Sequence, residues 1–376
     1  MKFKFMFAIM VMVLIAVAGC SNQLNGGAVA EDTIKIGYSA PFTGYLANLG
    51  EANFQGVELA LEKINANGGV AGRPVELIVV DDKFEGQLTL KAFHKFFDID
   101  DVNVMLTATY GGVLTVADLA DEQEVVVINT VDTAEELAEA GEYVFAIGIY
   151  DEGIGYALAD FANEQGKKVG VIFMNEDPFV QLVKEAFMER ISKEPAVVEA
   201  YGAADTDFRT QIMKAKNAEV ELLVVMGFEE AGLVLRQARE MGIEADFAGI
   251  DIFGTDALFE NSKGAVKGAF FTSWDAEDKE KFEEFNKKFV AKNGHEPEQA
   301  MFTVLGYDAV MVVAEAMEQA IAEGKEPRGE ALKEALHQIK GFEGVAGEIT
   351  MEEDGIVRSI EEQMFKVVDK GEFEKI

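Results

Sequence analysis

The sequence has very little cysteine, histidine, proline or tryptophan. Only one of its 376 residues, Cys20, is a cysteine, so no disulfide can form within one chain and packed apolar cores must stabilise the fold. The three histidines are scattered without metal-ligand spacing, and no phosphate loop is present. Ser39 is not in a nucleophile elbow, because Pro41 replaces the glycine that this turn requires. We therefore expect no enzyme, catalytic residue, metal or cofactor; an unrecognised hydrolase is the alternative.

Positive charge is also scarce. The chain has 33 lysines and arginines against 68 aspartates and glutamates, which gives a formal net charge of −35. Such a surface repels nucleic acid phosphates and anionic lipid head groups, so nucleic acid is excluded as a partner. We interpret the acidity as a solvated surface rather than as an acidic binding site.

The N-terminus has the pattern of an export signal. Lys2 and Lys4 precede an uninterrupted apolar run over 5–18, which is too short to span a bilayer comfortably. The run Val17-Ala18-Gly19-Cys20 that follows resembles a bacterial lipobox. It predicts a lipoprotein signal peptide over 1–19, lipidation of Cys20, a tether over 20–32, and an extracytoplasmic protein anchored to the cell membrane. A plain signal peptide with an incidental cysteine is the alternative.

Removal of this signal peptide changes the net charge from −35 to −37, because it carries two lysines and no acid. Later in the chain we find no run that is long and apolar enough to span a bilayer.

Beyond residue 32, short apolar runs alternate with amphipathic helical patterns, and the alternation restarts after Gly148. The expected strands are 34–37, 77–80, 104–106, 125–128, 169–174 and 222–226, and the expected helices are 54–65, 88–97, 113–123, 154–165, 182–192 and 233–241. Continuous Val- and Ile-rich runs are typical of parallel strands that are buried on both faces. The pattern predicts an α/β protein with two doubly wound parallel-sheet lobes, whose ligands bind beyond the carboxyl ends of the strands.

Particular motifs carry a family resemblance. Pro41, Thr43, Gly44 and Gly50 precede a helix that ends in Ile64-Asn65-Ala66-Asn67-Gly68-Gly69-Val70-Ala71-Gly72-Arg73. This opening resembles the leucine/isoleucine/valine-binding protein family, the receptors of branched-chain amino-acid ABC transporters. Further matching segments are 79–82, 205–208, 235–242 and 307–310.

The resemblance implies a type I periplasmic binding fold, a monomer that meets an ABC permease in the membrane, and three hinge crossings near 148–151, 271–274 and 347–350. Lobe one would then comprise 33–148 plus 275–346, and lobe two 149–274 plus 347–376.

In lobe one, the resemblance implies a site for a ligand carboxylate at Thr109, Tyr110 and Gly111, where amides at a helix start favour an anion. Glycines stand where relatives often have a serine, so the hydroxyl of Thr109 or Tyr110 could substitute for it, or the amides alone could serve. A tight Gly-Gly turn is the alternative interpretation. The next loop would contribute the carbonyl of Val131 and the hydroxyl of Thr133. Asp132 or Thr133 could equally cap the helix that follows.

In lobe two, Phe179 and Phe228 match aromatic wall positions, and Asp251 matches the acid that contacts a ligand ammonium. Core packing of the two rings and an exposed loop acid are the alternatives. Weaker wall candidates are Tyr45, Leu49 and Phe302. The favoured ligand is a small apolar amino acid of the branched-chain type. A small aromatic or aliphatic carboxylate or amide is the alternative ligand, and a ligand-sensing domain of a signalling system is the alternative role.

Overall fold

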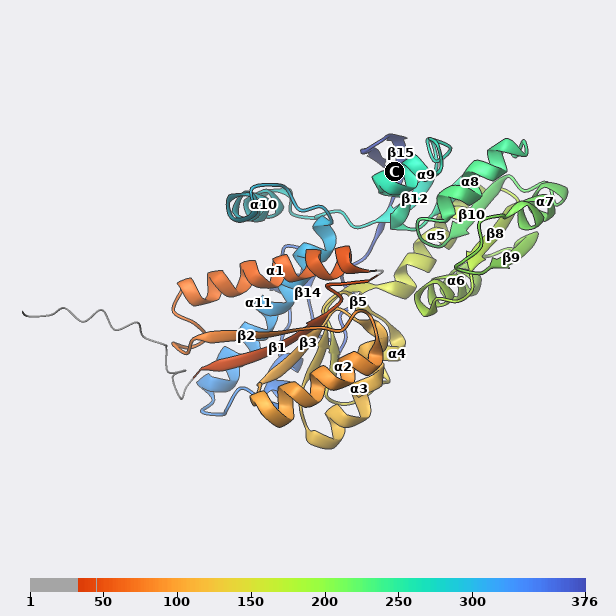
Figure 1. The fold of residues 1–376 in the computed structure, drawn as a ribbon. Coiled ribbons are helices and arrows are strands. Elements are labelled where there is room, and N and C mark those ends of the chain that lie inside the picture. Colours follow the sequence, from red (N-terminus) through yellow and green to blue (C-terminus); the bar gives the residue numbers. More distant parts are fainter. Residues whose placement is uncertain (1–32, 45) are drawn as a thin grey trace, which may run out of the picture.

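Two separate β-sheets organise the protein into two lobes (Figure 1). The computed structural model describes residues 33–44 and 46–376. The expected signal peptide, Cys20, the tether and Tyr45 lie outside the described residues.

The first sheet has five strands in the order β2-β1-β3-β4-β6, and every neighbouring pair is parallel. Its strands are β1 (Ile34–Ala40), β2 (Val75–Asp81), β3 (Val104–Thr107), β4 (Val127–Asn129) and β6 (Val144–Ala146). All residues of β3, β4 and β6 are buried, as the continuous apolar runs predicted. Two short strands, β5 (Asp132–Thr133) and β7 (Ile149–Tyr150), pair with each other beyond the sheet.

The second sheet has seven strands in the order β16-β15-β12-β11-β10-β8-β9. Its strands are β8 (Val169–Met174), β9 (Val197–Tyr201), β10 (Leu222–Met226), β11 (Asp246–Gly249), β12 (Phe270–Ser273), β15 (Gln363–Asp369) and β16 (Glu372–Lys375). Strands β8 to β12 are parallel, but β15 and β16 add an antiparallel edge that the sequence analysis did not predict. A separate pair, β13 (Phe342–Glu343) and β14 (Glu348–Ile349), is antiparallel.

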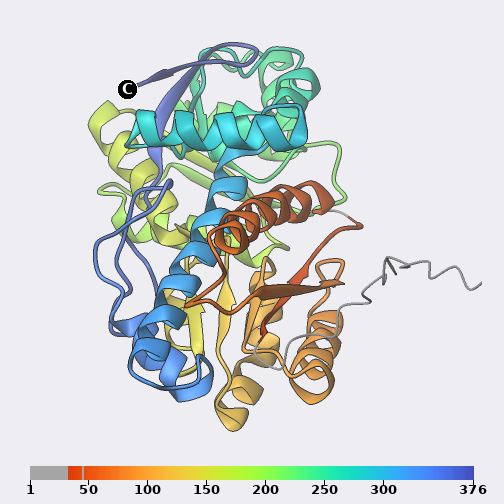
Figure 2. The ribbon, with the colours of Figure 1, turned by 90° about the vertical axis from the view of Figure 1, so that its left-hand side faces the viewer.

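The helices alternate with the strands. They are α1 (Ala47–Ala66), α2 (Gly86–His94), α3 (Tyr110–Gln123), α4 (Glu135–Ala138), α5 (Asp151–Gln165), α6 (Pro178–Arg190), α7 (Arg209–Asn217), α8 (Ala231–Glu240), α9 (Asp256–Asn261), α10 (Lys279–Asn293), α11 (Ala300–Ala322) and α12 (Gly329–His337), with short helices η1 (Lys95–Asp100) and η2 (Asp251–Gly254). The six expected helices are present, whereas α10 to α12 fall in a stretch for which we had predicted no element. Helix α11 packs along α1 in the first lobe (Figure 2).

Helix α11 corrects one expectation. By length and hydropathy it could cross a membrane, although the sequence analysis found no such run. In the fold, 67% of its most apolar window is buried, so it is a core helix of the first lobe.

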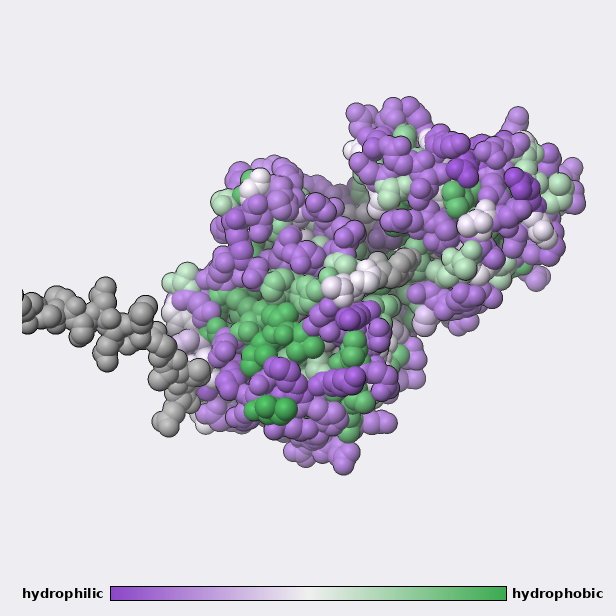
Figure 3. All heavy atoms as spheres, in the orientation of Figure 1, coloured by the Kyte–Doolittle hydropathy of each residue, from purple (hydrophilic) through white to green (hydrophobic). Residues whose placement is uncertain are grey.

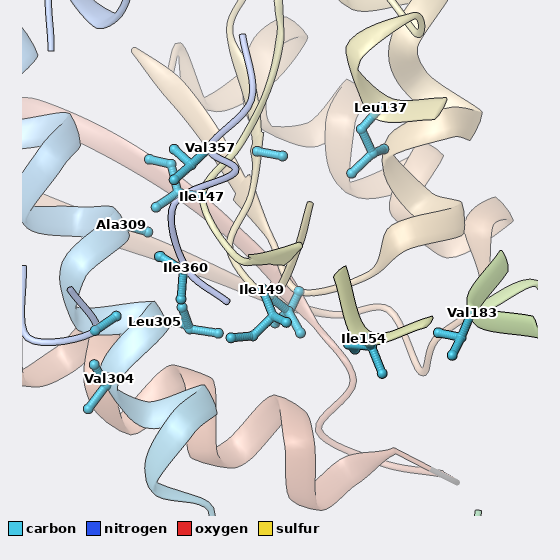
Figure 4. Packing of buried hydrophobic residues seen from close by; sticks show 14 of the residues in the cluster. Leu137, Ile147, Ile149, Ile154, Val183, Val304, Leu305, Ala309, Val357 and Ile360 are labelled. Carbon is cyan, nitrogen blue, oxygen red and sulfur yellow. The ribbon is translucent and has the colours of Figure 1, made fainter. Parts of the chain in front are cut away.

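The chain passes between the sheets after β6, after β12 and before β15. Residues that precede β15 remain bonded to the first lobe: Val357 N–H donates to Ala146 O (3.1 Å), and Tyr150 N–H donates to Ile360 O (3.2 Å). Val357 and Ile360 belong to the same apolar cluster as Ile147 (Figure 4). The crossing expected at 347–350 therefore lies later, near 360–362, because backbone bonds and apolar burial hold this segment against β6. Because β7 pairs with β5 of the first lobe, we propose lobes of 33–150 plus 275–360 and of 151–274 plus 361–376.

Candidate ligand-binding site

The candidate site lies where the carboxyl ends of the parallel strands in the two sheets face each other. In parallel sheets these ends share one edge, and loops from that edge position ligands. The predicted site residues follow β3 and β4 in the first lobe and β8, β10 and β11 in the second. Figure 3 shows the surface hollowed between the lobes; the face in view is mostly hydrophilic, apart from an apolar patch on the first lobe.

The start of α3 has the form expected of an anion site. A side chain at Gly111 would meet no heavy atom within 4 Å, so its backbone faces open space, whereas one at Gly112 would lie 2.6 Å from Thr89 Oγ1. The amides of Gly112 and Val113 both donate to Thr109 O (3.1 Å), which leaves those of Tyr110 and Gly111 as the candidate donors.

The side chains of Thr109 and Tyr110 form hydrogen bonds with other residues of the protein. Thr109 Oγ1 donates to the buried carboxylate of Asp82 (2.9 Å), which also accepts from Ser39 Oγ (2.7 Å). Tyr110 Oη donates to Glu136 Oε2 (2.8 Å). The hydroxyls of Thr109 and Tyr110 are therefore not substitutes for the missing serine, and the backbone amides remain as the anion donors.

The loop after β4 is fixed by Asn129, whose Oδ1 accepts from the amides of Val131 (2.8 Å) and Asp132 (2.9 Å). The carbonyl of Val131 accepts from Ile149 N–H (3.0 Å), so a ligand amine would have to use its second lone pair. The hydroxyl of Thr133 is fully buried and has no hydrogen-bond partner among the described residues. It does not cap α4, because the amide of Glu135 donates to Glu152 Oε1 (3.0 Å) instead.

Two aromatic rings follow strands of the second lobe. Phe179 lies in the first turn of α6, after β8, and Phe228 follows β10. Their rings are 6.4 Å apart and nearly parallel, at 23°. Both residues are partly exposed and pack against the apolar core, so they could form one apolar wall of the candidate site.

Asp251 begins η2 directly after β11 and Ile250. Its Oδ1 accepts from the amide of Ile252 (2.8 Å), which fixes the carboxyl group. The side chain retains some accessible area, yet it is surrounded by protein, and burial raises the pKa of Asp251 to about 6. A carboxyl group in this state gains stability when a cation joins it.

Three further buried acids were missed in the sequence analysis. Burial and Asp177 raise the pKa of Asp132 to about 7, and burial and Asp251 raise that of Glu362 to about 8. Burial and four neighbouring carboxyls, including Asp251, hold the pKa of Asp151 well above its usual range. The charged neighbours that shift these values within the described residues are all carboxyl groups. Asp132, Asp151, Asp251 and Glu362 therefore gather at the candidate site as acids whose ionisation is disfavoured.

The weaker candidates lie on neighbouring helices. Leu49 is in the first turn of α1 and Phe302 in the first turn of α11, and both are partly buried. The carbonyl of Phe302 accepts from Asn53 Nδ2 (3.0 Å), which ties the two helix starts together. Both stay candidate wall residues.

Two α/β lobes whose strand ends face each other across an acidic and aromatic cleft define the class of two-lobed solute-binding proteins. Residues 33–365 match the family described as periplasmic binding protein, and the chain belongs to that family. Its fold is the type I periplasmic binding fold.

Several characterised proteins are similar to this chain. The Leucine-, isoleucine-, valine-, threonine-, and alanine-binding protein of Pseudomonas aeruginosa is 27% identical over 92% of both chains. The Leu/Ile/Val-binding protein homolog 3 of Brucella melitensis is 28% identical and covers 89% of this chain and 91% of its own. The solved structure of the branched-chain amino acid transporter substrate binding protein LivJ from Streptococcus pneumoniae, in complex with isoleucine, has a TM-score of 0.78 and 27% identity, covering 91% of this chain and 98% of its own.

Proposed function

We propose that this protein is the extracytoplasmic receptor of an ABC importer and that it binds a small apolar amino acid of the branched-chain type. The amides of Tyr110 and Gly111, with the unpartnered hydroxyl of Thr133, would hold the ligand carboxylate. Asp251 would hold the ammonium, and Phe179 and Phe228 would pack against the side chain. The two lobes would close on the ligand because only the closed form makes both sets of contacts.

The observation that carries the proposal is that the facing edges of the two lobes suit ligand groups of opposite charge. The first lobe offers amide donors at a helix start, which suit an anion, and the second offers a buried carboxyl group, which suits a cation. A zwitterion matches both. The relatives from Pseudomonas aeruginosa and Brucella melitensis, whose names specify leucine, isoleucine and valine, support the same ligand class.

The alternative ligand, a carboxylate without an amine, fits less well. The paired phenylalanine rings would suit an aromatic acid. However, such an anion would not supply the positive charge that Asp251 favours, and within the described residues the charged neighbours that raise the pKa of Asp132, Asp151 and Glu362 are carboxyl groups. A ligand-sensing role would use the same cleft and differs only in the membrane partner.

Thermal unfolding with candidate ligands tests the ligand class. A ligand that binds only the folded protein stabilises it by about 2.7 kcal/mol at a hundredfold excess over its Kd. Leucine, isoleucine or valine should therefore raise the Tm of residues 21–376 by several degrees. Benzoate and 4-methylpentanoate are the controls without an ammonium. A response to these acids, with none to any amino acid, would favour the alternative ligand.

The lipid anchor is a separate part of the proposal, supported by the sequence Val17-Ala18-Gly19-Cys20 after a short apolar run. Cys20→Ser should abolish lipidation and leave the protein either soluble or unprocessed. Membrane fractionation and intact-mass measurement of the full chain test this, with Ser21→Ala as the matched control. A Cys20→Ser variant of mature length in the membrane fraction would contradict the lipobox.

A further inference from the structure

Asp251 has a close acidic neighbour that the expected ligand site does not include. In the parallel pair of β11 and β12, Gly249 lies opposite Phe271, so Asp251 continues beyond the same edge as Ser273. In the antiparallel pair of β12 and β15, Thr272 lies opposite Met364. Glu362 precedes Met364 by two residues and therefore extends from the face that carries Thr272. The strand register thus brings Asp251, Thr272 and Glu362 to the cleft edge of the second sheet.

Two polar atoms in this group lack hydrogen bonds of ordinary geometry. Glu362 is 7% exposed and Thr272 is fully buried, yet neither Glu362 Oε2 nor Thr272 Oγ1 has such a partner among the described residues. The Thr272 hydroxyl is near enough to Glu362 to oppose the rise of its pKa, but the contact between them is not a well-formed hydrogen bond. Buried polar groups without partners are rare in native proteins and commonly indicate a site that a ligand, ion or water completes. Glu362 Oε2 and Thr272 Oγ1 can both accept hydrogen bonds and lie next to the proposed ammonium site. They therefore indicate a ligand group that donates hydrogen bonds and carries positive charge.

The charged surroundings of Glu362 are acidic. From η2 it faces Asp251, and from α5 it faces Asp151, whereas β12 contributes only the uncharged Thr272. Asp132 and Glu152 act on Asp151 in turn. Two close carboxyl groups in a buried place do not both ionise, because each disfavours the charge of the other.

We propose that Glu362 is a second specificity-determining carboxyl group for the ligand's ammonium, and that the proton it shares with Asp251 in the empty cleft leaves when the ammonium binds. This inference rests on the proposed function, since it concerns the same cleft. The step is an exchange of cations: the ligand ammonium enters, one proton leaves to solvent, and the net charge of the site stays constant. A ligand without an ammonium offers no such exchange and is disfavoured.

Simple electrostatics sets the size of the effect. The pKa of Glu362 is raised to about 8 in the empty protein, so at pH 7 the group is about nine-tenths protonated. A positive charge about 4–6 Å away should lower the pKa of Glu362 by about two to three at an effective dielectric constant of about 20. Binding at pH 7 should then release about 0.8 protons.

Calorimetric titration of the protein with L-leucine at pH 7, in two buffers with different ionisation enthalpies, measures the number of protons released. Glu362→Gln should release about 0.8 fewer protons than the parent protein while still binding through Asp251. The neighbouring exposed Glu361→Gln is the matched control and should behave like the parent. Equal proton release by the parent and Glu362→Gln would overturn the inference.

A second measurement needs no ligand, so it also decides the inference if leucine does not bind and the proposed function fails. An acid whose pKa is raised by folding binds its proton more tightly in the folded state, so it lowers stability as the pH rises from its unfolded value, about 4.3, to its folded value. Glu362→Gln should therefore match the parent's Tm near pH 4 and exceed it by several degrees at pH 8–9. Parallel Tm curves of the two proteins across this range would overturn the proposal that Glu362 and Asp251 share a proton. Divergent curves without leucine binding would support the shared proton and contradict only the proposed ligand.

Discussion

Asp251→Asn should weaken the binding of the amino-acid ligand by about two to three and a half powers of ten. Removing one partner of a desolvated charge pair costs about 3–5 kcal/mol, because the remaining charge stays buried and unpaired. Here the remaining charge would be the ligand ammonium, which would lose its carboxyl partner at the start of η2. Calorimetric titration of the variant and the parent with the same ligand measures the loss.

The controls separate binding from folding. In the empty protein, the amide oxygen introduced by Asp251→Asn can still accept from Ile252 N–H. The substitution also removes a carboxyl group whose pKa burial raises, so the Tm should stay constant or rise slightly. Thr133→Ala removes one hydrogen bond and should cost less, about 1–3 kcal/mol of binding free energy. If Glu362 also interacts with the ligand ammonium, the Asp251→Asn, Glu362→Gln double variant should bind the ligand more weakly than Asp251→Asn. Parent-like affinity in the single variant would identify Asp251 as a structural acid.

Three candidate residues of the second lobe lie beyond strand ends, as expected: the apolar runs of β8 and β10 indicated two of these strands, and the family resemblance indicated Asp251. Phe179, Phe228 and Asp251 come after β8, β10 and β11, and the sheet order brings these strand ends to one edge. Glu362 could not be found in this way. It precedes an antiparallel strand, and the sequence of β15 alone does not reveal which way the strand runs.

The later part of the chain was predicted less well for a related reason. The segment 351–360 has no regular periodicity and is held to the first lobe by isolated bonds, such as that of Val357 N–H to Ala146 O. Local pattern indicates helices and strands, but it does not determine which lobe an irregular segment joins. Likewise, the sequence alone left the hydroxyl of Thr109 as a candidate ligand donor. Only the fold shows that this hydroxyl donates a hydrogen bond to Asp82.

The packing of α1 on α11 gives the second large effect: Gly56→Ala should lower the stability of the empty protein by about 3 kcal/mol, the upper end for overpacking. In an exposed helix, alanine in place of glycine stabilises by about 0.5–1 kcal/mol, so the sign here is reversed. A side chain on Gly56 would place Cβ 1.8 Å from the carbonyl oxygen of Thr303, and one on Gly306 would lie 2.2 Å from that of Asn53. Because both obstacles are backbone atoms in helices, α1 and α11 must move apart.

Thermal unfolding without ligand tests this packing. Gly56→Ala should lower the Tm by about 6–12 °C, taking about 2–4 °C per kcal/mol for a lobe of this size. Gly111→Ala is the control, because its new methyl group meets open space at the start of α3 and should leave the Tm of the empty protein nearly constant. The separation of α1 from α11 should also loosen Asn53, whose amide nitrogen bonds Thr130 O and Phe302 O (3.0 Å each). Since Thr130 directly precedes the loop residue Val131, a Gly56→Ala variant that still folds should bind its ligand more weakly. Parent-like stability would show that α1 and α11 do not approach at these glycines.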